Sequence, residues 1–343
     1  MGTVSFGVFD WIDERDATST SELYDTRLEL IRAADEAGFF AYHLAEHHST
    51  PLGMAPSPSV FLAAVARETR RIRLGPLVYL LPLYEPLRLA GEIAMLDQLS
   101  HGRFELGVGR GVSPYELAYR GVDHTTTKDV FLESLDTIVA ALTTDVLSAG
   151  GQRTPRYEDV PVQLHPLQRP YPPLWYATTM VDSAAWAGAE GINLMGLGPA
   201  GDFRACVDAY RQAERAAAGR TDRLNGHVAD PHLGLQRQVV LASTDEEAWE
   251  VAAAAYPGFV RNYSHLWLHH GDERTAARTD LDRNHRTGTM FIGSPSTVRA
   301  LVEQQIDETG VNYFALSFAW GDLTPEQSRR SLELFAEHVM GVC

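Results

Sequence analysis

The feature that most constrains the fold is a regular alternation of short apolar runs with longer segments of helical periodicity. The runs predicted to be strands are residues 4–8, 40–44, 72–78, 104–108, 174–178, 192–195, 235–241 and 313–317. The helices predicted to follow them are residues 22–37, 58–68, 86–99, 130–147, 181–189, 202–218, 245–255 together with 295–307, and 325–339. Eight strand–helix units in succession predict an α/β fold, the (β/α)8 TIM barrel.

The length of the chain places extra segments in this barrel. A TIM barrel typically needs about 250 residues, and this chain has 343. Two stretches account for the surplus: residues 148–173, rich in Pro, Gly and Gln, and residues 258–290, rich in His, Arg and Asp. Neither has the composition of a linker between domains. We therefore expect residues 1–343 to form a single TIM-barrel domain with two insertions.

Charge and cysteine content limit the partners of the chain. The formal net charge is −16 and the basic residues are scattered, which argues against nucleic-acid binding. No run of about eighteen apolar residues predicts a membrane-spanning helix, and residues 1–6 lack an export or lipid-anchoring signal. The two cysteines, Cys206 and Cys343, are too few for a disulfide framework or a zinc site. We expect a cytoplasmic protein that acts on a small organic molecule.

Two adjacent histidines, His47 and His48, follow the second predicted strand. The segment from His43 to His47 matches the zinc-binding pattern H-x-x-E-H, but that pattern requires a helix, and this segment is predicted to be a strand with its exit loop. No metal site is therefore expected. Catalytic residues of a TIM barrel gather at the ends of its strands, and an imidazole titrates near neutrality. His47 and His48 are catalytic candidates, and a structural histidine pair is the alternative.

A glycine-rich loop follows the fourth predicted strand. It lacks the third glycine of a dinucleotide-binding fingerprint, because Val112 stands in that place, and the first strand carries no such motif. What remains at Gly109 and Arg110 is a flexible backbone beside a guanidinium, a combination suited to a terminal phosphate. A glycine turn with a solvated arginine is the alternative.

Hydroxyl side chains follow the fifth predicted strand, where the next helix begins. Thr178, Thr179 and Ser183 lie there, and helix N-termini bind anions through free N–H groups and the helix dipole. Ordinary N-capping explains such residues equally well. Together with Arg110 they form the second half of a predicted phosphate site. His269 and His270, in the second insertion, are expected to mark a solvated loop without a role.

The chain resembles the bacterial luciferase-like flavin monooxygenases over nearly its whole length. The resemblance is carried by the order and spacing of several motifs rather than by any single one. These motifs are Ala45-Glu46-His47-His48, Arg73-Leu74-Gly75 through Glu85-Pro86, Met95 to Phe104, Leu106 to Gly111, Phe291-Ile292-Gly293-Ser294-Pro295, and Ser331 to Ala336.

The resemblance implies a TIM-barrel monooxygenase that uses O2 and reduced FMN, by way of a 4a-peroxyflavin, to oxygenate a small organic substrate. A separate NAD(P)H-dependent flavin reductase is the implied partner. The catalytic histidine of the luciferases corresponds to His47, with His48 beside it. The phosphate contacts correspond to Arg110, the backbone of Val112, Thr179 and Ser183. A non-proline cis peptide under the flavin ring is expected at Leu77-Val78.

The chain also departs from the luciferases at some positions. Gly109 stands where luciferase has a reactive cysteine, so light emission is not implied. Gly91 replaces an acidic residue of the luciferase dimer contact, and Thr179 replaces a glutamate at the phosphate site. A homodimer through residues 86–99 is still expected, because the apolar residues of that helix lie on more than one face.

Three aromatic residues, Phe9, Phe318 and Trp320, are expected to wall the substrate pocket, with core packing as the alternative. Two other functions stay open at this point. One is a deazaflavin-dependent hydride-transfer oxidoreductase on the same fold. The other is a flavin-binding subunit of a heterodimer without turnover of its own, against which the presence of both histidines speaks.

Overall fold

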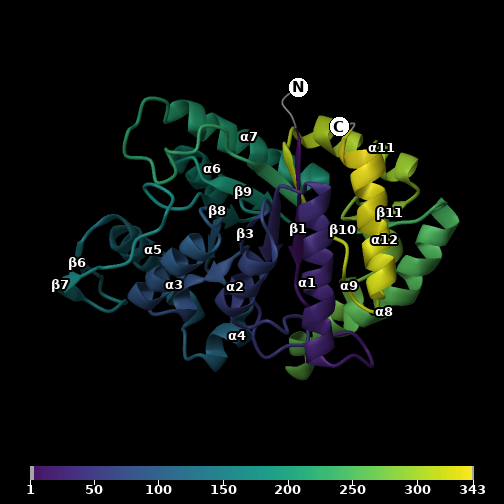
Figure 1. Cartoon of the computed structure of the whole chain (residues 1–343), viewed down its shortest axis with the longest axis horizontal. Helices are drawn as coiled ribbons and strands as arrows, with labels where there is room; N and C mark the ends of the chain where they lie inside the picture. The colour runs from purple at the N-terminus through teal and green to yellow at the C-terminus, as the bar shows by residue number, and fades with distance from the viewer. Residues whose placement is uncertain (1–3, 342–343) are drawn as a thin grey trace.

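A ring of parallel strands surrounded by helices makes up the body of the molecule in the computed structural model (Figure 1). The structure describes residues 4–341, apart from the side chains of Ala277 and Arg278. Cys343 and the first three residues of the predicted domain lie outside the described residues. The strands are β1 (Ser5–Asp10), β2 (Ala41–Leu44), β3 (Arg73–Pro76), β4 (Tyr79–Leu80), β5 (Leu106–Gly109), β6 (Val146–Ala149), β7 (Tyr157–Pro161), β8 (Leu174–Ala177), β9 (Asn193–Gly196), β10 (Leu233–Leu241), β11 (Met290–Gly293) and β12 (Tyr313–Ser317).

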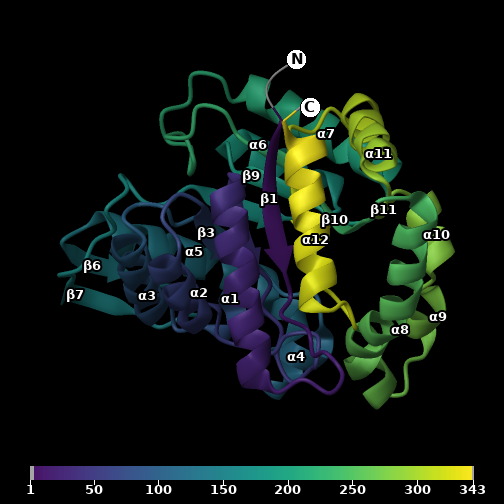
Figure 2. The same ribbon diagram turned by 45° about the vertical axis from the view of Figure 1, so that its right-hand side comes forward.

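The helices alternate with these strands, and most begin with a proline in the first turn or a side-chain cap. They are α1 (Thr20–Ala37), α2 (Pro58–Glu68), α3 (Pro86–Leu99), α4 (Pro114–Tyr119), α5 (Thr127–Thr143), α6 (Val181–Glu190), α7 (Ala200–Ala216), α8 (Asp245–His269), α9 (Arg274–Arg278), α10 (Leu281–Arg286), α11 (Pro295–Thr309) and α12 (Pro325–Phe335). In Figure 2, α1 and α12 flank β1, and α8 to α10 stand together at one side.

The strands pair in the order β3, β2, β1, β12, β10, β9, β8, β5 and β4, and every pairing in this ring is parallel. An isolated parallel bridge between Leu74 and Phe104 joins β3 to the segment before β5 and closes the ring. Backbones approach closely there: a Cβ added to Gly75 or Gly107 would lie about 2 Å from a carbonyl oxygen of the facing segment. The predicted TIM barrel is therefore confirmed.

Two strand predictions differ from the structure. The third strand, expected over residues 72–78, ends at Pro76 as β3, and the cis peptide between Leu77 and Val78 separates it from β4, which begins at Tyr79. The strand β11 was not predicted at all. Gln238 of β10 pairs with Met290 of β11 and also with Ser317 of β12. Because a strand has only two edges, β11 lies on the edge of β10 opposite to β12.

The two insertions are more ordered than their composition suggested. The segment predicted as 148–173 carries the antiparallel hairpin β6–β7, which projects from the body beside α3 and α5 (Figure 1). The predicted helix 245–255 was too short, because α8 continues through Pro257 to His269. A proline inside a helix lacks the N–H that would donate to the carbonyl four residues earlier, yet α8 continues past Pro257. The carbonyl of Ala255 accepts the backbone N–H of Asp322 at 3.2 Å, which joins α8 to the loop after β12.

Side chains of the strands alternate between the barrel interior and the layer under the helices. Phe314 and Leu316 of β12 pack in the outer cluster with residues of α1 and α12, whereas Tyr313 and Ala315 belong to the inner cluster. The interior also holds polar groups: Trp175 Nε1 donates to Glu105 Oε2 at 2.5 Å, and Glu105 forms an ion pair with Arg73. Burial raises the pKa of Glu105, although Arg73 and the hydrogen bond from Trp175 act in the opposite direction.

The helix α3 packs on both sides within its own chain. Leu89, Ile93 and Leu96 are buried, and α2 and α5 are its neighbours. Contacts inside one subunit thus account for most of the apolar residues on which the dimer prediction rested, and Met95 remains 54% exposed. Homodimerisation stays a prediction. No described helix is long and apolar enough to cross a membrane.

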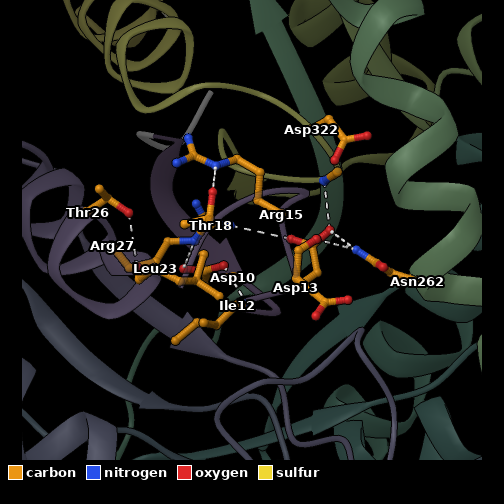
Figure 3. A network of polar contacts seen from close by, with 12 residues as sticks. Asp10, Ile12, Asp13, Arg15, Thr18, Leu23, Thr26, Arg27, Asn262 and Asp322 are labelled. Carbon is orange, nitrogen blue, oxygen red and sulfur yellow. Dashed lines mark hydrogen bonds and ion pairs between the residues drawn. The ribbon is translucent and has the colours of Figure 1, made fainter. Parts of the chain in front are cut away.

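A buried polar network joins the start of the chain to α8 and to the loop after β12 (Figure 3). Asp13 lies in the loop after β1 and is fully buried. It accepts hydrogen bonds from Gly321 N at 2.7 Å and from Asn262 Nδ2 at 3.3 Å, and its other oxygen faces Arg27 at 3.4 Å. Arg27 also pairs with Asp10 at 3.2 Å. The network fixes the insertion helix α8 against the carboxyl end of β1.

Candidate active site

The residues predicted to form the site lie in loops that leave the carboxyl ends of neighbouring strands. His47 and His48 follow β2, Arg110 follows β5, and Thr178 and Thr179 follow β8. Because all of these strands are parallel, their carboxyl ends open at one end of the barrel. In Figure 2, β1 points toward this end, where α4 lies.

His48 is held in the loop after β2 by contacts on both ring nitrogens. Its Nε2 lies 2.6 Å from Glu46 Oε1, and its Nδ1 lies 3.3 Å from a terminal nitrogen of Arg120. The second oxygen of Glu46 accepts the backbone N–H of Leu80 at 3.0 Å. Glu46 therefore ties the histidine loop to β4, just beyond the cis peptide.

His47 shares one acceptor with the backbone of its neighbour. Its Nδ1 lies 3.3 Å from Glu116 Oε1, the oxygen that also accepts the backbone N–H of His48 at 2.6 Å. Burial alone would raise the pKa of Glu116, but the hydrogen bonds and charges of His47 and His48 outweigh it and lower the pKa. The His47 side chain is 23% exposed, whereas that of His48 is 8% exposed. His47 is thus the more accessible member of the pair.

His43, the first histidine of the zinc-like pattern, points away from this pair. It lies on β2, is fully buried in the barrel interior, and shares a hydrogen bond of 2.8 Å between its Nε2 and the hydroxyl of Tyr313. Burial lowers its pKa to about 3, which keeps the ring neutral. The pattern spans a strand and a loop, as predicted, so its histidines do not share the helical face that a zinc site of this type requires.

The predicted phosphate residues follow two adjacent strands. β5 pairs with β8 through Val108 and Tyr176, so the loops containing Arg110 and Thr178 begin side by side. The helix α6 begins at Val181, and its N-cap, Met180, supplies no side-chain hydrogen bond. The hydroxyl of Thr178 instead accepts the backbone N–H of Met180 at 3.0 Å. The first turn of α6 is therefore free of a side-chain cap.

Other predicted site residues take different positions. Thr179 is exposed and Ser183 is half-buried in the first turn of α6. Arg110 is half-buried, and no described carboxylate pairs with it, while the side chain of Val112 is 82% exposed. A side chain at Gly109 would collide with Val78, since an added Cβ would lie 2.4 Å from its Cγ2.

The bond between Leu77 and Val78 is a cis peptide, as the resemblance implied. The backbone N–H of Leu77 donates to the carbonyl of Leu44 at 2.7 Å. β4 then pairs with the end of β5, Leu80 opposite Gly109. The cis peptide thus lies next to the glycine-rich loop and the histidine loop.

The three aromatic residues predicted to wall a pocket do not lie together. Phe9 and Trp320 belong to the inner cluster, where Phe9 packs on Trp11 and Trp320 on Phe259 of α8. The prediction for Phe318 was wrong. Its ring packs against Phe39 and Phe335 in the outer cluster.

Sequence reasoning missed the partners of the two histidines. Glu46 was part of the quoted motif but received no role, and Glu116 and Arg120 were not considered. The one signal present was Ser113 three residues before Glu116, a pattern that predicts a helix start. Ser113 does cap α4 by accepting the backbone N–H of Glu116 at 3.3 Å. That pattern gives no indication that the carboxylate reaches a loop 68 residues earlier.

Comparisons with known proteins place this barrel in a family. A family model described as luciferase-like monooxygenase matches residues 4–313. An uncharacterized protein of Sinorhizobium fredii is 39% identical over 95% of this chain and 93% of its own. The oxygenase component of a flavin-dependent trigonelline monooxygenase from Acinetobacter baylyi is 29% identical over 74% of this chain and 68% of its own.

A solved structure agrees with these sequence matches. The crystal structure of the monooxygenase RslO1 from Streptomyces bottropensis superimposes with a TM-score of 0.83 at 26% identity, covering 98% of this chain and 99% of that one. The family model matches most of the chain and agrees with the barrel fold. The chain belongs to the luciferase-like monooxygenases, a family of flavin-dependent oxidoreductases.

Proposed function

We propose that the chain is the FMN-dependent oxygenase of a two-component system, in which a separate NAD(P)H-dependent reductase supplies the reduced flavin. The observation that carries this proposal is the uncapped first turn of α6 beside the Arg110 loop. Free N–H groups at the start of a helix and a guanidinium that no described carboxylate pairs with together suit a phosphate monoester. FMN ends in such a group, so the residues present fit the cofactor.

The chain holds the flavin from two sides in this proposal. Arg110, the backbone of Val112, and the residues Thr178, Thr179 and Ser183 bind the phosphate. The backbone at Leu77-Val78 and Gly109 supports the ring, because the absence of a side chain at Gly109 leaves the cis peptide uncovered. When bound and reduced, FMN supplies the two electrons that let O2 give one oxygen atom to the substrate and the other to water.

The two histidines have different tasks in this proposal. His47 holds or transfers a proton at the reacting oxygen, since it is the more exposed of the pair and lies on the loop after β2. His48 fixes the loop through Glu46 and Arg120. Phe9 and Trp320, which lie in the inner cluster, give the substrate an apolar wall and help to exclude water.

The chain acts as a single barrel domain in this proposal, and as a homodimer through α3. Multi-angle light scattering checks the second point. A dimer that is converted to a monomer by Met95→Glu supports the α3 interface, because Met95 is the exposed apolar side chain of that helix. A monomer in the unsubstituted protein contradicts it.

Cofactor choice and oxygen use are tested in two steps. Anaerobic titration of the purified protein with reduced FMN, reduced riboflavin and reduced F420 measures which cofactor binds, and tight binding of FMN alone is expected. The FMN complex is then mixed with 18O2 and a panel of ketones, alkenes and aromatic acids. A product that gains one 18O atom supports the proposal. Reduction of a substrate by F420 without 18O indicates hydride transfer instead, and binding of FMN without any oxygenated product indicates a non-catalytic flavin-binding subunit.

A further inference from the structure

We infer that α4 is a positioning helix that places the proton of His47 and the proton of His48 on opposite ring nitrogens. Two side chains of opposite charge, one in α4 and one in the residue that follows it, face the histidine loop. Glu116 contacts His47 and Arg120 contacts His48. The consequence is that one histidine is available for proton transfer and the other is not.

The contact with Arg120 determines which ring nitrogen of His48 carries the proton. A guanidinium has only hydrogen-bond donors, so Nδ1 of His48, 3.3 Å away, must be the acceptor and carries no proton. The proton of the neutral ring is then on Nε2, which donates to Glu46 at 2.6 Å. Both nitrogens are thereby occupied inside the protein, and His48 has no position left for a substrate.

The contact with Glu116 places the proton of His47 on Nδ1, the nitrogen that carries no proton in His48. An ionised carboxylate has only acceptors, so Nδ1 of His47 carries a proton and donates it. No hydrogen bond within the described residues uses Nε2 of His47. This nitrogen is therefore free to take a proton from a reacting group or return one, and the neighbouring charge of Glu116 stabilises the imidazolium that results. Glu116 acts through His47 and is a positioning residue.

A neighbouring face of α4 packs against the second insertion. Tyr115 stacks on His270 with ring centroids 4.0 Å apart and planes 4° from parallel, and the hydroxyl of Tyr119 lies 2.6 Å from His270 Nε2. Tyr115 also meets Trp267 of α8 edge to face at 5.3 Å. A helix of six residues depends on such packing for its place. The insertion thus helps to hold Glu116 and Arg120 against the histidine loop.

The first test reads the proton positions directly and does not need the cofactor. Two-bond 1H–15N spectra of the full chain, labelled at histidine, distinguish the tautomers of the neutral rings, and His47→Gln and His48→Gln assign the signals. We expect a proton on Nδ1 of His47 and on Nε2 of His48. In Arg120→Ala, the spectrum of His48 should show a mixture of both tautomers, whereas the proton of His47 should stay on Nδ1. The same tautomer on both histidines of the unsubstituted protein overturns the inference.

The second test rests on the proposed function and measures turnover. Glu116→Gln keeps an acceptor for the backbone of His48 but loses the negative charge. We expect kcat to fall by roughly 10²-fold, toward the lower end of the contribution of a positioned acid or base, with the Kd for FMN unchanged. Glu333→Gln, at an exposed ion pair of α12, is the matched control and should leave kcat unchanged.

The two tests fail in different ways. Opposite tautomers together with an unchanged kcat in Glu116→Gln overturn the positioning role. A loss of FMN binding equal to the loss of kcat indicates a structural role for Glu116 and also contradicts the inference. If the unsubstituted protein oxygenates nothing, the proposed function is wrong, and the histidine spectra still decide the arrangement of protons.

Discussion

Asp13 and Asn262 are 249 positions apart in the chain, and the side-chain amide of Asn262 donates to the buried carboxylate of Asp13 at 3.3 Å (Figure 3). This contact joins the loop after β1 to α8. The backbone N–H of Gly321 donates to the same carboxylate oxygen at 2.7 Å. One side chain thus links three segments that surround the open end of the barrel.

Stability should depend on the protonation of Asp13. Burial raises its pKa from 3.8 to about 7, against the opposing effects of Arg27 and Gly321. Between these two pH values the folded protein keeps a proton that the unfolded chain releases. The contribution of Asp13 to the free energy of unfolding is therefore complete below the unfolded pKa of 3.8 and is lost as the pH rises to about 7. Asp13→Asn cannot titrate. From about pH 5 to pH 8, its Tm should fall less than that of the unsubstituted protein in scanning calorimetry.

The exposed Asp25 of α1 provides the control for this experiment. Asp25→Asn should follow the pH dependence of the unsubstituted protein. Equal slopes of Tm against pH in all three proteins would mean that Asp13 is ionised throughout this range.

Loss of Arg110 should weaken FMN binding but not riboflavin binding. A charge-assisted contact to phosphate contributes about 1.5–3 kcal/mol, so Arg110→Ala should raise the Kd for FMN by roughly 10- to 100-fold. Titration calorimetry with both flavins measures the difference. Arg88→Ala removes an 82% exposed arginine of α3 and is the control. Equal losses for the two flavins would place Arg110 away from the phosphate.

Loss of His47 should slow oxygenation far more than it weakens flavin binding. We expect His47→Ala to lower turnover by roughly 10²- to 10⁴-fold, the usual contribution of a positioned acid or base, with little change in the Kd for FMN. His48→Ala should have a smaller effect on turnover, because both of its ring nitrogens already contact protein groups. Near-normal product formation by His47→Ala would make His47 a structural residue.

Loss of His270 should loosen α4 without touching any residue proposed to bind flavin. The stacking of Tyr115 on His270 and the contact of Tyr119 are lost in His270→Ala. Aromatic pairs of this kind contribute about 0.5–1.5 kcal/mol, so amide exchange in residues 113–121 should accelerate by roughly 2- to 10-fold. Hydrogen–deuterium exchange with mass spectrometry measures this. Leu268→Ala, at an exposed position of α8, is the control, and equal exchange in both variants would show that α4 does not depend on His270.

The sequence determined the architecture because strand and helix periodicity are local properties. The eight strand–helix units, the proline-marked helix starts and the division of His43 from His47 by a strand end can all be obtained from neighbouring residues. The strand β11 was missed because three apolar residues and a glycine beside a polar insertion carry too little pattern. The length of α8 was missed because a proline inside a helical pattern usually marks a helix end, whereas α8 continues through Pro257 to His269.

The placement of loops at one end of the barrel also followed from the sequence, since parallel strands share a direction. It was harder to predict whether a given side chain points into the barrel or outward toward the helices where a strand ends. Phe318 turns outward to Phe39 and Phe335, whereas Trp320 lies in the inner cluster. Alternation is reliable inside a strand but gives no information beyond its last paired residue.

Only the tertiary structure decided how the two histidines differ. They are identical and adjacent in the sequence, and each contributes the same ring. The contact of Glu116 with His47 and that of Arg120 with His48 join residues 69 and 72 positions apart in the sequence. Hydrogen bonds between distant loops depend on the relative placement of whole strands and helices, and local patterns of residues do not encode that placement.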